Sequence, residues 1–319
     1  MTGTPHAQRR ETNGLPQRLP LEPNKAVRSL AVASLVSEIL IVVTGGAVRL
    51  TSSGLGCPTW PKCTPESLHA TAEMGIHGAI EFGNRLLTFV LVAIAFAMLV
   101  SVWRMAKQRK DLFRLSIALL AGIPAQAVIG GITVWTHLNP WVVGCHFVVS
   151  MSMVTLATLL VHRAWLDNAR ASTVVQRFTT STVRQLLWAL AVLSGLAILL
   201  GVMVTGSGPH AGDAMAPRNN LHPDLITRVH VLPVYLLVAT TVVLLVMAYR
   251  NSRFVPLRRP LLLFAAVVAL QAVIGYWQHF TGLPILLVGL HMLGASLLAA
   301  ACAHVVYVGV TRQPAALRH

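Results

Sequence analysis

Eight long apolar segments most strongly limit how this chain can fold. Each approaches the roughly 20 residues that an α-helix needs to cross a bilayer. They begin near Leu30, Ile76, Leu115, Trp141, Leu186, Ile226, Pro260 and Leu283. Because 55% of all residues are hydrophobic and only 11% are charged, the chain has too few polar residues to cover these segments in water. The sequence therefore predicts an all-α integral membrane protein with eight transmembrane helices in contact with the lipid bilayer.

The 25 Lys and Arg residues divide unevenly between the two sets of loops. Five of them, Arg49, Lys62, Arg85, Arg218 and Arg228, fall in one set of loops and the adjoining helix ends, and all the others fall in the opposite set. The positive-inside rule then places both termini in the cytoplasm of a multi-pass plasma-membrane protein. The same distribution accounts for the net charge of +15, so no nucleic-acid partner is expected.

A repeat divides the chain into two halves. The pentapeptide of residues 126–130, QAVIG, returns at 271–275, and a histidine follows each glutamine by 20 residues, as His146 and His291. Four helices per half give both halves the same orientation, which predicts two pseudo-symmetric four-helix bundles. The expected divisions are a disordered cytoplasmic tail (1–28), an N-terminal bundle (29–165), a cytoplasmic linker (166–183), a C-terminal bundle (184–310) and a second tail (311–319).

Three histidines fall at matching depths in even-numbered helices. His146 and His291 lie about six residues, or roughly 8 Å, below the outer helix ends, and His230 lies similarly near the start of helix six. A single intramembrane histidine is usually a hydrogen-bonded packing residue. Duplication and matched depth instead favour iron ligation. Two imidazoles that face each other can hold the iron of a flat macrocycle between them, whereas zinc requires a compact tetrahedral set of ligands. We therefore expect His230 and His291 to hold a heme in the extracytoplasmic leaflet.

The first half differs chemically from the second. Asn84 occupies the position aligned with His230, and His77, Glu81 and Arg85 share its helix face at spacings of three and four. One interpretation of Glu81 is an ion pair that orders the helix end. The other is general acid-base catalysis beside a heme held by His146. This asymmetry predicts one catalytic half and one electron-transferring half.

Two further features leave alternatives open. Cys57 and Cys63 lie in the first outer loop, where the compartment permits a disulfide, either as a loop staple or as a redox-active pair. Zinc ligation with His69 and His77 is disfavoured by irregular spacing. Glu38 is an intramembrane carboxylate whose role the sequence leaves open.

Two motifs together resemble the heme A synthase family, of the bacterial, actinobacterial-like type. They are GGAVRLTSSGLGCPTWPKC at 45–63 and IEFGNR at 80–85, and the resemblance covers residues 29–310. It implies an oxidoreductase that converts the C8 methyl of heme O to the formyl of heme A. It also implies a heme b cofactor in the second half and a heme O synthase as the upstream partner.

The resemblance assigns roles to individual residues. It implies that His230 and His291 ligate heme b, that His146 is an axial ligand of the substrate heme, and that Glu81 is needed for turnover. Cys57 and Cys63 match the outer-loop pair of the family.

Two departures qualify these assignments. Asn84 stands where most members have a histidine, so His77 becomes the candidate second ligand of the substrate heme. The third outer loop, residues 206–224, also lacks the cysteine pair of some members.

Two other classes of function compete with the enzyme. A non-catalytic diheme b-type cytochrome would exchange electrons with quinone, but Glu81 occurs in only one half. A transporter, including a heme exporter, is disfavoured because no span is broken by paired Gly or Pro near mid-bilayer in both halves. The electron acceptor of the enzyme is not identified by the sequence.

Overall fold

The computed structural model of this protein describes residues 19–168 and 178–311, and its regular elements there are all helical. Eight helices are long and apolar enough to cross a membrane. They are α2 (Lys25–Leu50), α3 (Gly75–Val102), α4 (Lys110–Trp135), α5 (Pro140–Ala164), α7 (Ser181–Ser207), α8 (Pro223–Arg250), α9 (Val255–Phe280) and α10 (Ile285–Val310). Short 3-10 helices, Ala72–Met74, Trp103–Met105 and Ser252–Phe254, adjoin α3 and α9. The predicted all-helical membrane fold is confirmed.

The ends of the chain and the segment between the halves are described only in part. Most of the tail expected at 1–28, part of the linker expected at 166–183 and nearly all of the tail expected at 311–319 lie outside the described residues. Helix α2 begins at Lys25, five residues before the apolar run does. The reason is a polar cap, because the Asn24 side chain accepts a 3.1 Å hydrogen bond from the Val27 N–H.

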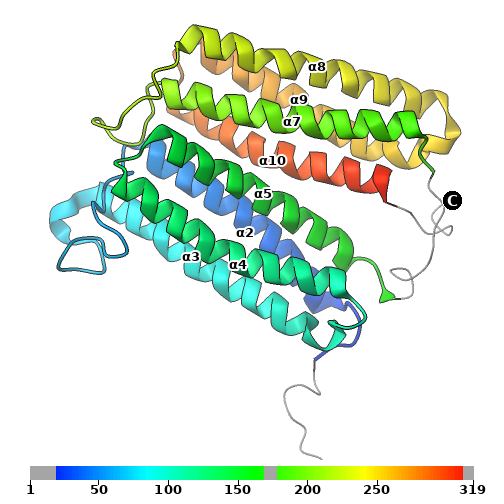
Figure 1. Ribbon diagram of the computed structural model, residues 1–319, viewed down its shortest axis with the longest axis horizontal. Coiled ribbons are helices and arrows are strands. Elements are labelled where there is room, and N and C mark those ends of the chain that lie inside the picture. The colour runs from blue at the N-terminus through cyan, green and yellow to red at the C-terminus, as the bar shows by residue number, and fades with distance from the viewer. Residues whose placement is uncertain (1–18, 169–177, 312–319) are drawn as a thin grey trace, which may run out of the picture.

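The eight helices form two bundles of four that lie side by side (Figure 1). In the first, α2 and α4 each pack against α3 and α5, and in the second, α7 and α9 each pack against α8 and α10. Each bundle has its own apolar core, one around Met98 and Leu112 and the other around Leu187 and Phe264. The halves predicted from the repeat therefore correspond to separate packing units.

The contacts between the bundles follow the repeat. Helices α5 and α10, the fourth of each half, pack against each other, while α10 also contacts α2 and α5 also contacts α7. Exchanging the halves reproduces the same set of contacts, which is what a pseudo-two-fold axis requires. A small apolar core that includes Val42, Val154 and Ala299 fills this interface.

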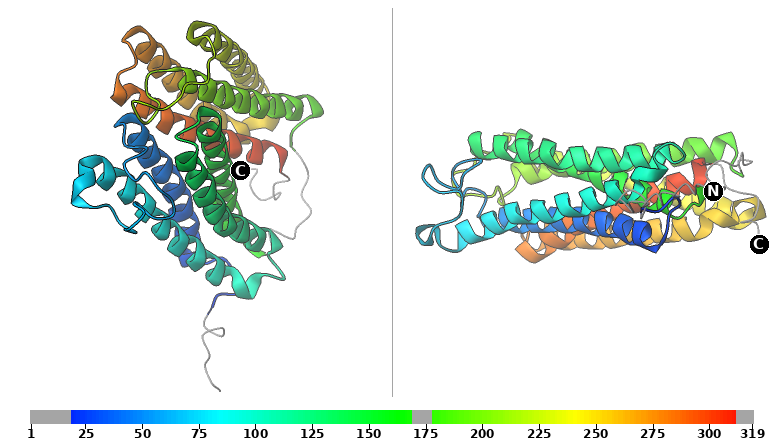
Figure 2. Two further views of the ribbon diagram at one scale, coloured as in Figure 1. Left: turned by 60° about the vertical axis from the view of Figure 1, so that its left-hand side comes forward. Right: turned by 90° about the horizontal axis from the view of Figure 1, so that it is seen from below.

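The two longest loops that the structure describes lie at one end of the molecule, shown on the left in Figure 1 and again in the turned views of Figure 2. They are residues 51–71, between α2 and α3, and residues 208–222, between α7 and α8. They contact each other, because the Gly54 N–H donates a 2.8 Å hydrogen bond to the Gly212 carbonyl. We call this the long-loop end.

Candidate functional site

The second bundle contains a pair of neighbouring imidazoles. His230 of α8 and His291 of α10 lie close enough to interact electrostatically. The Nδ1 atom of each ring is buried and has no hydrogen-bond partner among residues 19–168 and 178–311. A buried polar atom without a partner loses its hydration without compensation. His230 also makes a hydrogen bond with the backbone of Ala197, but the unpartnered Nδ1 atoms leave room for a ligand on each ring.

A glycine of the neighbouring helix makes room for each ring of this pair. A Cβ added to Gly201 of α7 would lie 3.2 Å from the His230 ring, and one added to Gly275 of α9 would lie 3.3 Å from the His291 ring. Contacts this short are tighter than ordinary van der Waals packing. The glycines thus let the imidazoles lie directly against the helix backbone.

The first bundle repeats half of this arrangement. His146 of α5 packs on Gly130 of α4, where an added Cβ would lie 3.5 Å from the ring, and its Nδ1 is again buried without a partner. Gly130 and Gly275 are the last residues of the two copies of the pentapeptide. The repeat therefore marks the backbone surface on which each histidine rests.

Asn84 replaces the second imidazole in the first bundle. Its side-chain oxygen accepts a 2.7 Å hydrogen bond from the Thr44 hydroxyl of α2. The residue thus closes a helix–helix contact at the position that aligns with His230. The two bundles differ here as the sequence predicts.

Glu81 is a buried carboxylate in α3, and both of its oxygens have partners. Oε1 accepts from Arg85 Nη2 at 2.5 Å, and Oε2 accepts from the backbone N–H of Cys57 at 2.6 Å. The ion pair that the spacing of four residues suggested is therefore present. The contact to Cys57 was not expected, because the sequence alone does not show where the first outer loop folds.

Cys57 and Cys63 form a disulfide, and both cysteines are fully buried. The loop that they close is held on α3 by Arg85, whose guanidinium donates to the carbonyls of Cys57, Thr59 and Lys62 at 3.1–3.2 Å. The predicted disulfide is confirmed. Among the described residues no group of three or more metal-binding side chains occurs, so a zinc site with His69 is not observed.

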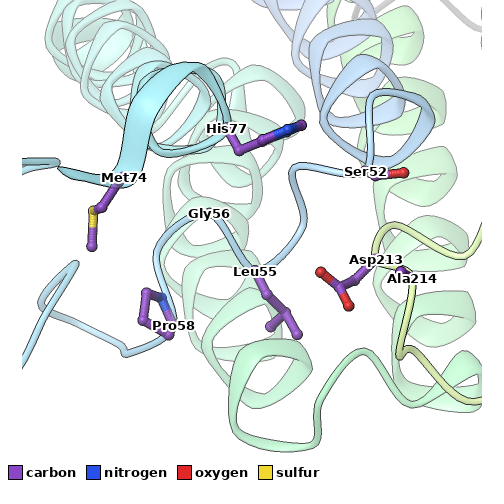
Figure 3. Close-up of a pocket in the computed structure, with 8 residues that line it drawn as sticks. All are labelled: Ser52, Leu55, Gly56, Pro58, Met74, His77, Asp213 and Ala214. Carbon is purple, nitrogen blue, oxygen red and sulfur yellow. The ribbon is translucent and has the colours of Figure 1, made fainter. Parts of the chain in front are cut away.

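His77 lies near the start of α3. Its Nδ1 is 2.9 Å from the Ser53 hydroxyl, and its side chain is exposed. It lines an open cavity of about 510 Å³ at the long-loop end, together with Ser52, Leu55 and Asp213 (Figure 3). Because His77 is seven residues before Asn84, about 10 Å nearer the helix end, the two side chains occupy different levels.

Gln126, the first residue of the repeat, was not recognised from sequence as a site residue. Its amide nitrogen donates to the His146 carbonyl at 3.2 Å and to the Ser150 hydroxyl at 2.5 Å, and its buried Oε1 has no partner. Its counterpart Gln271 has a buried Nε2 that finds no partner in the part of the chain that the structure describes. The signal was available, because both copies keep the glutamine 20 residues before the histidine.

Arg49 connects the two halves at the long-loop end. Its Nε donates to the His210 carbonyl at 2.6 Å and its Nη2 to the Thr205 carbonyl at 3.0 Å, both in the second half. His210 in turn contacts the Leu283 carbonyl through Nε2 at 2.8 Å. The sequence showed Arg49 inside a specific motif but gave no indication of these distant partners.

Together these features define a class: polytopic helical membrane proteins built from two equivalent four-helix bundles, with histidines near one end whose Nδ1 atoms have no partner among the described residues. Residues 28–303 match the family described as COX15-CtaA, cytochrome oxidase assembly protein. The chain belongs to this family, and the resemblance to heme A synthases is confirmed.

Curated relatives carry the name heme A synthase. One from Listeria monocytogenes serovar 1/2a is 24% identical over 289 residues, covering 86% of this chain and 93% of that protein. One from Lysinibacillus sphaericus is 26% identical over 300 residues, covering 87% and 93%. One from Staphylococcus epidermidis is 25% identical over 202 residues, covering 60% and 65%.

Proposed function

We propose that this protein is a heme A synthase, which oxidises the C8 methyl group of heme O to the formyl group of heme A. The observation that carries the proposal is the difference between two otherwise equivalent bundles. One has the imidazole pair of His230 and His291, and the other has His146 together with the buried carboxylate of Glu81.

We assign heme b to the second bundle, where the imidazoles of His230 and His291 would hold it. The donor set fits, because each imidazole has a buried ring nitrogen without a partner and rests on a glycine that leaves no side chain beside it. When bound, heme b would supply one-electron transfer. The protein residues fix the two rings and keep them at neighbouring positions on α8 and α10.

We assign heme O, the substrate, to the first bundle, with His146 as the axial ligand. Gln126 fixes the backbone of α5 at His146 through its 3.2 Å hydrogen bond to that carbonyl. Asn84 offers an amide already bonded to Thr44 in place of a second imidazole. We therefore infer that His146 holds the substrate with one protein ligand, and that His77, which faces the outer cavity, is not the second ligand.

Glu81 is the residue we propose for proton transfer. An ionised carboxylate only accepts hydrogen bonds, and Glu81 accepts one from Arg85 and one from Cys57. These two contacts orient the carboxylate and favour its ionised form, in which it can act as a base for a proton released when the methyl group is oxidised. The ion pair that orders the helix end and the catalytic role are compatible, since the same contacts orient the carboxylate.

The disulfide contributes at least by fixing the loop whose backbone contacts Glu81. We propose that the long-loop end faces the extracytoplasmic side, where disulfides persist and few basic residues occur. The heme sites then lie in the outer leaflet. A heme O synthase would supply the substrate, and an electron acceptor must remove the electrons.

The experiment that tests this proposal is identification of the hemes that the purified protein carries. The protein is expressed in a host that makes heme O but not heme A, and the hemes are extracted with acid-acetone and separated chromatographically. Heme b together with heme A is the expected result. Heme b alone, despite available heme O, would indicate a non-catalytic b-type cytochrome, and no heme would contradict the proposal altogether.

A further inference from the structure

Two tyrosines meet on the lipid-facing side of the second bundle. The hydroxyls of Tyr235 in α8 and Tyr276 in α9 are 2.6 Å apart, although the side chains are 56% and 45% exposed. Two hydroxyls have two hydrogens, and the bond between them uses one. Within the described residues neither hydroxyl makes another hydrogen bond, so one donor faces outward.

The depth of this donor separates it from the aromatic residues that commonly border a membrane. Tyr235 is the thirteenth residue of α8, about 18 Å along the helix from the long-loop end, whereas Tyr276 lies four residues, about 6 Å, from the end of α9 at the same end. Their hydroxyls meet between these two levels. Interfacial tyrosines instead lie at the level of the headgroups, where water can accept their hydrogen bonds. A hydroxyl donor in the hydrocarbon region has no such acceptor and is stabilised by a ligand that brings one.

Aromatic side chains surround the pair on this face. The rings of Tyr276 and Phe280 lie within 11° of parallel, with centroids 6.2 Å apart. Trp277 and Phe280 are exposed beside them, and the His279 ring meets Phe280 edge-on at 5.2 Å. This surface suits a planar apolar ring that carries a hydrogen-bond acceptor on its edge.

The tyrosine pair lies beside the histidines of the second bundle and has no equivalent at the aligned positions of the first bundle. Tyr276 directly follows Gly275, the residue on which the His291 ring rests. The aligned positions of the first half are Phe89 and Gly131, which carry no hydroxyl, and the Trp60 ring packs against Gly131. The donor pair thus occurs only beside the histidines that we assign to electron transfer.

We propose that Tyr235 and Tyr276 bind the carbonyl group of a membrane-soluble quinone, which is the electron acceptor of the reaction. This inference rests on the proposed function. Conversion of a methyl to a formyl group with oxygen from water breaks two C–H bonds, forms a C=O bond and releases four electrons and four protons. Two quinones each take up two electrons and two protons and leave as quinols, so the reaction balances.

The test is photolabelling of the full-length protein, carrying its hemes, in nanodiscs of phosphatidylcholine and phosphatidylglycerol. The probe is a short-chain azido-naphthoquinone, and adducts are located by peptide mass spectrometry. We expect adducts within residues 232–238 and 273–280. Loss of a hydrogen bond worth about 1 kcal/mol should reduce labelling roughly fivefold in the Y235F/Y276F double variant.

The control is Tyr249→Phe, because Tyr249 is a similarly exposed tyrosine at the other end of α8. Its labelling should equal that of the unmodified protein, and excess unlabelled quinone should compete with the probe. Equal labelling in the double variant, or competition by added phospholipid alone, would overturn the assignment, the latter by identifying a lipid ester carbonyl as the ligand.

Heme extraction from the same samples separates the two proposals. Heme b and heme A together with tyrosine-independent labelling would refute only the quinone site. Tyrosine-dependent labelling of a protein that binds no heme would refute the proposed function and support quinone binding.

Discussion

The carboxylate of Glu81 accepts a 2.6 Å hydrogen bond from the backbone N–H of Cys57, and so joins α3 to the disulfide-closed loop. The same carboxylate is paired with Arg85, which holds the rest of that loop through three carbonyls. A buried acid of the first bundle is therefore oriented by a loop that lies outside the helices. Loop structure and site chemistry depend on the same residue.

Glu81→Gln should separate these two roles. Glutamine keeps an oxygen that can accept from Cys57 but cannot take up a proton as a carboxylate does. We expect heme binding and the disulfide to persist while heme A formation falls by about 10²-fold or more, the usual contribution of general acid-base catalysis. Chromatography of extracted hemes and thiol titration measure the two outcomes. Glu73→Gln, at an exposed acid of the adjoining 3-10 helix, is the matched control, and normal product in Glu81→Gln would refute the catalytic role.

His230→Ala and His291→Ala should each remove heme b, because both imidazoles would be needed to hold it. We expect the heme b absorbance per protein to fall to a small fraction in both variants. His222→Ala, at the exposed residue preceding α8, should retain it. Unchanged heme b in both site variants would show that the ligands lie elsewhere.

Gly275→Ala tests the packing surface rather than the ligand itself. The added Cβ would lie 3.3 Å from the His291 ring and should displace it, which would change the visible and paramagnetic resonance spectra of bound heme b. Gly195→Ala in α7 meets no atom within 4 Å and should leave the spectra unchanged. Identical spectra for both variants would mean that the ring does not depend on this glycine.

Arg49→Ala should loosen the contact between the halves. Its guanidinium donates to two carbonyls of the second half, and a hydrogen bond from a charged group contributes about 1.5–3 kcal/mol. We expect a lower midpoint of thermal unfolding, followed by tryptophan fluorescence. Arg228→Ala, at an exposed position near the start of α8, should have little effect, and equal midpoints for the two variants would argue against the bridging role.

His77→Ala tests whether His77 serves as the second ligand of the substrate heme, given that Asn84 stands where most members of the family have a histidine. Because His77 contacts Ser53 and lines the outer cavity, its removal should leave the spectrum of the substrate heme intact. Ser53→Ala removes the same hydrogen bond and serves as the comparison. Loss of the substrate-heme signal in His77→Ala alone would restore His77 as a ligand.

The apolar runs, the repeat and the residue types were sufficient to predict the membrane spans, the two bundles and the candidate ligands. Helical hydrogen bonding satisfies the backbone locally, so the length and spacing of apolar residues are enough to predict eight spans. The repeat predicted two bundles, and the spacing of Glu81 and Arg85 gave an ion pair as one of two interpretations, because residues four apart on a helix are neighbours. The three histidines that pack on glycines, His146, His230 and His291, were predicted as ligands because they lie at matching depths and because His146 and His291 follow the two copies of the repeat.

What only the tertiary structure decided are the contacts between segments far apart in the chain. The bond from Cys57 to Glu81, the reach of Arg49 to the second half and the meeting of Tyr235 with Tyr276 depend on how loops fold and how helices rotate about their axes. Sequence periodicity shows which residues share a helix face, but it does not show which other helix that face contacts. In a membrane this limit is severe, because lipid-facing and bundle-facing surfaces are both apolar and the pattern that distinguishes them in water is lost.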